Sequence, residues 1–134
     1  MDPSDDNNDA IRWASYNGKT EVVKLLLADP RVDPSVSNNF AIRFASGNGH
    51  TEVVKLLLAD PRVDPSVRNN YAIIWASNNG HTEVVKLLLA DPRVDPSGSD
   101  NEAIRWASIN GQTEVVKLLL ACLLYTSPSP RDRS

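Results

Sequence analysis

The sequence predicts an all-α solenoid of four stacked helix-turn-helix units, and three observations support this prediction. Aromatic side chains recur at intervals of 31 residues, at Trp13, Phe44, Trp75 and Trp106. The string TEVVKLLL occurs four times, beginning at Thr20, Thr51, Thr82 and Thr113. The first three copies are each followed by the linker DPRVDPS. A period between about 20 and 50 residues is typical of arrays whose units bury their apolar sides against their neighbours.

The first helix of each unit is expected to begin after a pair of Asn or Asp residues, such as Asn38-Asn39. Side chains of this kind accept hydrogen bonds from the unpaired amides of a first helical turn. Ala41 and Ala45 then fall on one side of the helix and allow a neighbouring helix to approach closely. Gly49 tolerates positive φ, so it is expected to end this helix.

The second helix of each unit is apolar around most of its circumference. Thr51 is a candidate cap, Glu52 and Lys55 can form an ion pair, and Leu57 belongs to two adjacent apolar stripes. Burying each Leu or Val contributes roughly 1.5–3 kcal/mol. Because Pro61 cannot continue the helix, it stops at the linker. The units are therefore expected to be stable only together.

The run from Ala45 to Leu58, ASGNGHTEVVKLLL, resembles the ankyrin repeat pattern A-A-x-x-G-H-x-E-V-V-K-L-L-L. The resemblance covers residues 7–121. Two features depart from the family, since Phe40-Ala41-Ile42-Arg43 replaces T-P-L-H and the units have 31 residues where about 33 are usual. The resemblance implies a non-enzymatic scaffold whose first helices and linker tips line a concave surface that binds proteins.

The repeat register divides the chain into six parts. Residues 1–6 form an acidic partial linker, and residues 122–134 form a tail that breaks the pattern. The repeats themselves are expected at residues 7–37, 38–68, 69–99 and 100–121, the last one truncated. The tail, CLLYTSPSPRD and onwards, resembles the conceptual translation of a transposase adapter used in sequencing libraries. We therefore interpret it as non-biological and the chain as a fragment of a longer ankyrin-repeat protein.

Composition narrows the classes of function. The formal charge is −3, which gives no strong field for nucleic acid. A single cysteine excludes an internal disulfide. The sequence has neither an apolar run of about 18 residues nor a signal peptide, so no membrane partner is expected and the protein is expected to be intracellular, in the cytoplasm.

No catalytic, cofactor-binding or metal-binding residues are predicted, and no cofactor is expected. His50 and His81 occupy the same place in adjacent units, where the other units have Lys19 and Gln112. This pattern is typical of a turn residue rather than of a metal ligand or general base. The sequence contains no Gly-rich phosphate loop, nucleophile elbow or HExxH motif.

The candidate protein-binding residues come from two columns of the repeat and from variable positions beside them. They are Arg12, Trp13, Phe40, Arg43, Phe44, Arg68, Tyr71, Ile74, Trp75, Glu102, Arg105 and Trp106. Aromatic and Arg side chains are common anchors of protein interfaces. The alternative interpretation is packing between repeats, with arginines stacked on the rings.

Three sets of positions vary between units while the core stays fixed. They are Ser37, Arg68 and Ser99; Asp9, Phe40, Tyr71 and Glu102; and Tyr16, Gly47, Asn78 and Ile109. A scaffold can change its contacts in this way, although neutral drift at exposed positions gives the same pattern.

The predicted function is a protein-protein interaction scaffold with a protein partner. Two alternatives stay open: a nucleic-acid surface built from the Arg and Trp columns, and the targeting module of an enzyme. We also expect the fourth second helix to run on to Leu124 or Tyr125, because no breaker precedes Pro128. Its face containing Val115, Leu118 and Leu119 is expected to stay exposed and to promote self-association.

Overall fold

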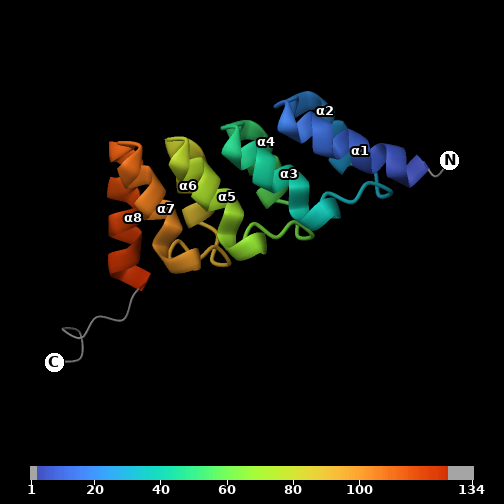
Figure 1. The fold of residues 1–134 in the computed structure, drawn as a ribbon. Coiled ribbons are helices and arrows are strands. Elements are labelled where there is room, and N and C mark those ends of the chain that lie inside the picture. Colours follow the sequence, from blue (N-terminus) through green and yellow to red (C-terminus); the bar gives the residue numbers. More distant parts are fainter. Residues whose placement is uncertain (1–2, 127–134) are drawn as a thin grey trace.

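A computed structural model describes residues 3–126, with side chains over residues 8–123, and shows helices only in this part. The helices are α1 (Pro3–Tyr16), α2 (Thr20–Leu27), α3 (Val36–Gly47), α4 (Thr51–Leu58), α5 (Val67–Asn78), α6 (Thr82–Leu89), α7 (Gly98–Ile109) and α8 (Thr113–Thr126). Consecutive pairs form four units that stack in chain order, with α1 at one end and α8 near the other (Figure 1). The prediction of an all-α repeat solenoid is confirmed.

Like helices pack on like helices along the array. The first helices α1, α3, α5 and α7 contact one another in that order, and the second helices do the same. Each first helix also packs on the second helix of its own unit. None of the helices in the described part of the chain is long and apolar enough to cross a membrane.

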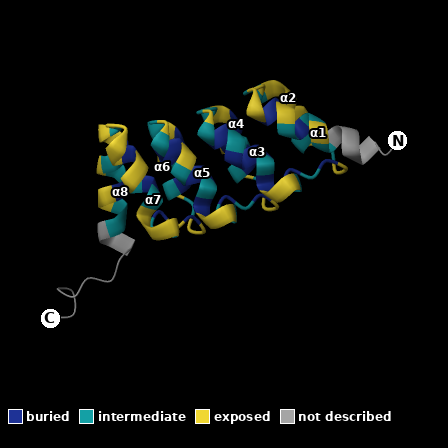
Figure 2. Ribbon diagram, viewed as in Figure 1, coloured by how far each residue is buried: buried dark blue, intermediate teal, exposed yellow. Residues whose placement is uncertain are grey.

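The repeated apolar residues form one continuous core. Val53, Val54 and Leu57 are fully buried, and their counterparts in the third unit are buried as well. Figure 2 shows the buried residues between the helices and the exposed ones at the turns and linker tips. Because Leu57 lies where neighbouring units meet, its burial depends on more than one unit, as the periodic pattern predicts.

The linkers are tied to one another by hydrogen bonds across the stack. Arg62 is anchored by Asp60, at 2.9 Å between Nη2 and Oδ2, and its Nη1 donates to the Val32 carbonyl in the preceding linker at 2.8 Å. Arg93 repeats this bond to the Val63 carbonyl at 2.7 Å. These arginines therefore connect neighbouring units.

The asparagine pairs do not cap the first helices as predicted. Ser37, Asn38 and Asn39 all have left-handed backbone angles, with φ of 57, 55 and 57°, so the right-handed part of α3 starts after Asn39. The Asn39 Oδ1 instead accepts a hydrogen bond from the backbone N–H of Asp64, at 2.9 Å, in the next linker. Asparagine tolerates this conformation better than most residues. Asn39 therefore ties the start of its helix to the linker at the end of the same unit, instead of capping the helix.

Two other expectations about helix starts need correction, whereas the expected turn glycine and the expected ion pair are confirmed. Thr51 is the first residue of α4, and the residue before it, His50, makes no side-chain cap. In the first unit α1 already begins at Pro3, before its asparagine pair. As predicted, Gly49 has a positive φ of 76°, and Lys55 pairs with Glu52 at 3.1 Å.

The last helix runs on into the tail as predicted, but the expected exposed face is wrong. α8 ends at Thr126, one residue beyond the expected limit. Val115 and Leu119 are 1% and 0% exposed because this side of α8 packs on the preceding unit. The exposed large apolar residues in the described part of this unit are Trp106, Ile109 and Leu120, so self-association through this unit would involve them and stays a prediction.

Candidate protein-binding face

The predicted site residues lie on the first helices and follow the array from unit to unit. A chain of ring contacts runs through Trp13, Tyr16, Phe40, Phe44, Tyr71 and Trp75, with centroid separations from 4.4 to 6.4 Å. Tyr16 belongs to this chain although it was not among the predicted site residues. Part of the aromatic column therefore serves packing between repeats, which was the alternative interpretation.

Most of the contacts made by the arginine column are with other residues of the array itself. The Arg43 Cζ lies 5.3 Å from the Phe44 ring centroid and 5.2 Å from that of Tyr71. Its Nε and Nη2 donate to the carbonyls of Asn38 and Ser37, each at 2.9 Å. Burial, together with the nearby charge of Arg68, lowers the pKa of Arg43. Arg43 thus holds the left-handed turn of its own unit and stacks on the next one.

The first unit repeats this stacking, but the third unit cannot. Arg12 lies over the Phe40 ring at 5.6 Å and also pairs with Asp9. At the equivalent position the third unit has Ile74, which faces Glu102 where the earlier units present a ring. Both side chains are shorter than the ones they replace, so the junction between α5 and α7 is not filled.

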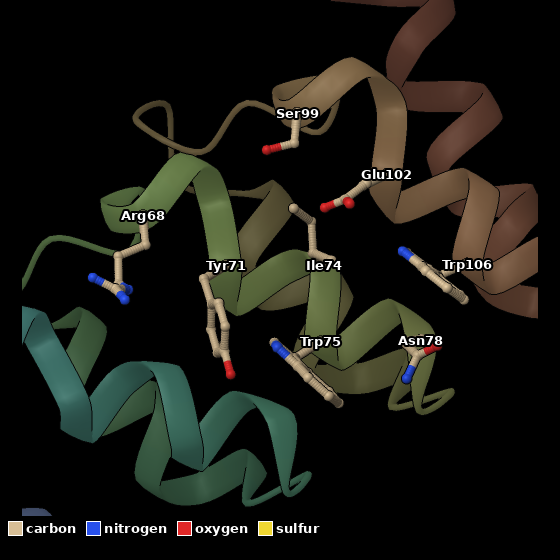
Figure 3. A pocket seen from close by; sticks show the side chains of 8 residues that line it. All are labelled: Arg68, Tyr71, Ile74, Trp75, Asn78, Ser99, Glu102 and Trp106. Atoms are coloured by element: carbon tan, nitrogen blue, oxygen red, sulfur yellow. The ribbon is translucent and has the colours of Figure 1, made fainter.

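A pocket of about 380 Å³ occupies this junction (Figure 3). Its lining consists of Arg68, Tyr71, Ile74, Trp75, Asn78, Ser99, Glu102 and Trp106. Trp75 and Trp106 are 40% and 42% exposed, which makes their indoles accessible to a partner. Figure 3 shows Glu102 reaching from α7 toward the middle of the pocket, whereas the guanidinium of Arg68 points away from Glu102. The pocket is thus lined by two accessible indoles and by one carboxylate.

A second, smaller pocket of about 210 Å³ lies between α3 and α5. Tyr71 and Trp75 line both pockets, so the two form one groove across three first helices. The smaller one also contains Tyr16, Arg43, Phe44, Gly47, Asn48 and Asn79.

Six of the predicted site residues come together in the larger pocket, and the others lie elsewhere. Arg12 lines a separate shallow pocket with Asp9 and Ser37, and Arg105 lines neither that pocket nor the two pockets of the groove. Asn78 and Ser99 were missed as site residues. Both stand at positions that vary between units, so that variation was the signal for them.

The histidines have structural surroundings. The His50 Nε2 lies 2.8 Å from the Tyr16 carbonyl oxygen, and the His50 ring covers Gly18 of the preceding turn. His81 covers Gly49 in the same way. No group of three or more His, Cys, Asp or Glu residues suited to a metal lies within the part of the chain that the structure describes.

The fold and the groove define a class of protein, a helical repeat array that presents a grooved face of variable side chains on a fixed core. The sequence profile described as "Ankyrin repeats (3 copies)" matches residues 1–69 and 42–132, and the chain belongs to the ankyrin-repeat family. No curated protein matches the sequence.

A solved structure supports the same fold. A chain in the crystal structure of the yeast ribosomal protein Rps3 in complex with its chaperone Yar1 is similar to this chain with a TM-score of 0.71 and 25% sequence identity. The match covers 97% of this chain and 99% of that chain. The family and this likeness support a protein-interaction scaffold.

Proposed function

We propose that this protein binds a protein partner through the groove formed by α3, α5 and α7. The single observation that carries this proposal is the origin of the residues lining the larger pocket. All eight belong either to the aromatic and arginine columns or to positions that differ between units. By contrast, the TEVVKLLL sequence of the second helices is the same in all four units, and the DPRVDPS linker is the same in the first three. Variation concentrated at an accessible aromatic pocket favours recognition over packing.

The alternatives receive less support from the geometry. A nucleic-acid surface needs arginines that can reach phosphates, but Arg43 is buried and its guanidinium is bonded to two carbonyls. Arg12 is paired with Asp9. The family supports a non-catalytic role, and the targeting module of an enzyme would use the same groove. The proposed location is the cytoplasm, where a partner would be encountered.

Site-directed photo-crosslinking tests the proposal. A photoreactive amino acid replaces Ser99, which lines the larger pocket, in one variant and Lys86, on the exposed side of α6, in the control. In an extract of cells that express the protein, the groove variant is expected to form a discrete crosslinked product that excess unlabelled protein suppresses. Excess Trp75→Ala protein should not suppress it. Equal products from both positions, or suppression by Trp75→Ala as strong as by the unaltered protein, would contradict the proposal.

A further inference from the structure

At one junction of the groove, between α5 and α7, the arginine position of the repeat is not occupied by an arginine. At the first two junctions an arginine of one unit lies over a ring of the next, Arg12 over Phe40 and Arg43 over Tyr71. At the third junction the equivalent residues are Ile74 and Glu102. The pocket between α5 and α7 is therefore the site that an arginine side chain occupies at the preceding junction.

The surroundings of this site retain the features that hold Arg43 at the second junction. Trp75 takes the position of Phe44, whose ring lies 5.3 Å from the Arg43 Cζ. Trp106 adds a second accessible indole. Indoles are the best aromatic partners for cations, and a planar guanidinium stacks on them.

Glu102 supplies the opposite charge. It makes no hydrogen bond or ion pair with any other described residue, and it stands within the pocket lining. Arg68, the other charged residue of the lining, opposes a cation, but its guanidinium points away from Glu102 (Figure 3) and it acts electrostatically on Arg43. The two charges thus lie apart, and the carboxylate of Glu102 is directed toward Ile74 and the middle of the pocket.

We propose that the pocket between α5 and α7 receives an arginine side chain of the protein partner, stacked on Trp75 and Trp106 and ion-paired with Glu102. This inference rests on the proposed function and names the chemistry of the group that is bound. Arginine fits better than lysine because its fork can bond both carboxylate oxygens while its flat face covers an indole. The partner's arginine then takes the place that Arg43 has at the junction between α3 and α5.

The test uses N-acetyl-arginine methylamide as the probe and the indole N–H signals of the protein in two-dimensional nuclear magnetic resonance. Saturable shifts are expected for Trp75 and Trp106, with Trp13 as an internal reference because it lies outside this pocket. The citrulline analogue has the same shape without the charge and should shift them little. Glu102→Gln should weaken the arginine response on the order of tenfold.

Ile74→Arg provides the second variant, since it places the array's own guanidinium in the pocket. It should abolish the response while the Trp13 signal shows that the fold is retained. Equal shifts with the citrulline analogue, or responses unchanged in both variants, would overturn the inference. If the photo-crosslinked partner is still captured by Glu102→Gln and Ile74→Arg as well as by the unaltered protein, the inference fails and the proposed function stands. If no partner is captured at all, the proposed function itself fails.

Discussion

The junction between α3 and α5 and the junction between α5 and α7 share their linkers and second helices but differ at the first helices. In the first, Arg43 bonds two carbonyls and stacks on two rings, and the cavity beside it is about 210 Å³. In the second, Ile74 and Glu102 leave about 380 Å³ open. The comparison shows that a repeat array can keep the residues of one layer unchanged and change its surface chemistry in another layer by exchanging two side chains.

The largest expected effect lies in the layer that both junctions share. Leu57→Asp places an unpaired charge between units, and we expect a loss of several kcal/mol with unfolding that spreads to the neighbours. Hydrogen exchange measures the spread. Leu25→Asp is the matched control, because Leu25 is 75% exposed in the first unit. Loss of protection confined to residues 38–68 would contradict the coupling between units.

The next prediction concerns Asn39 and Asn70, whose side chains accept a hydrogen bond from the linker at the two junctions in the same way. Asn39→Ala removes the bond to Asp64 and puts alanine at a φ of 57°, so we expect a loss of about 2–3 kcal/mol. Asn39→Gly removes the same bond but accepts that angle, and about 1 kcal/mol should be lost. Urea unfolding measures both. Equal losses would mean that the left-handed angle is not a constraint.

A smaller effect is expected at the serines buried in both junctions. The hydroxyls of Ser46 and Ser77 are fully buried, and neither has a hydrogen-bond partner among the described residues. Ser46→Ala should therefore leave the free energy of unfolding unchanged or raise it by about 1 kcal/mol. Ser108→Ala is the control, since the exposed Ser108 Oγ donates to the Ile104 carbonyl at 2.7 Å. Destabilisation by Ser46→Ala would show that this hydroxyl is bonded.

The smallest effect concerns the acidic ends of the linkers. Hydrogen bonds from Arg31 lower the pKa of Asp29 from 3.8 to about 2, and those from Arg62 lower the pKa of Asp60. A lowered carboxylate pKa stabilises the folded state above the unfolded value, and this contribution is lost as the pH falls through the folded value. Stability should thus be flat near neutrality and fall between about pH 4 and about pH 2. Denaturation of Asp60→Asn should show a weaker pH dependence; an unchanged one would contradict the assignment.

The fold followed from the sequence because its signals are periodic and local. The spacing of the aromatics, the repeated TEVVKLLL string and the DPRVDPS linkers place every helix in the right order. The roles of Asn39 and Arg62 could not be predicted, because their bonding partners lie 25 and 30 residues away in sequence. The exposed side of α8 was assigned wrongly, since a helix apolar on most sides does not reveal which side meets the preceding unit.

The candidate site followed from the sequence only in part. The columns identified the first-helix face, and six of the predicted residues line the larger pocket. Which of them pack and which stay accessible depends on cross-unit geometry. The arginine column contains both the buried Arg43 and Ile74, which lies beside an open pocket. The 31-residue period makes these two positions equivalent and so does not distinguish them.

Exchanging the two side chains tests the comparison most directly. The double variant Ile74→Arg with Glu102→Tyr gives the junction between α5 and α7 the residues of the junction between α3 and α5. Its new guanidinium can bond the carbonyls of Arg68 and Asn69 and stack on the introduced ring and on Trp75, so the free energy of unfolding should rise by about 1–3 kcal/mol. Urea denaturation at neutral pH measures this change. An unchanged or lower value would contradict the claim that the pocket is the unfilled counterpart of the Arg43 site.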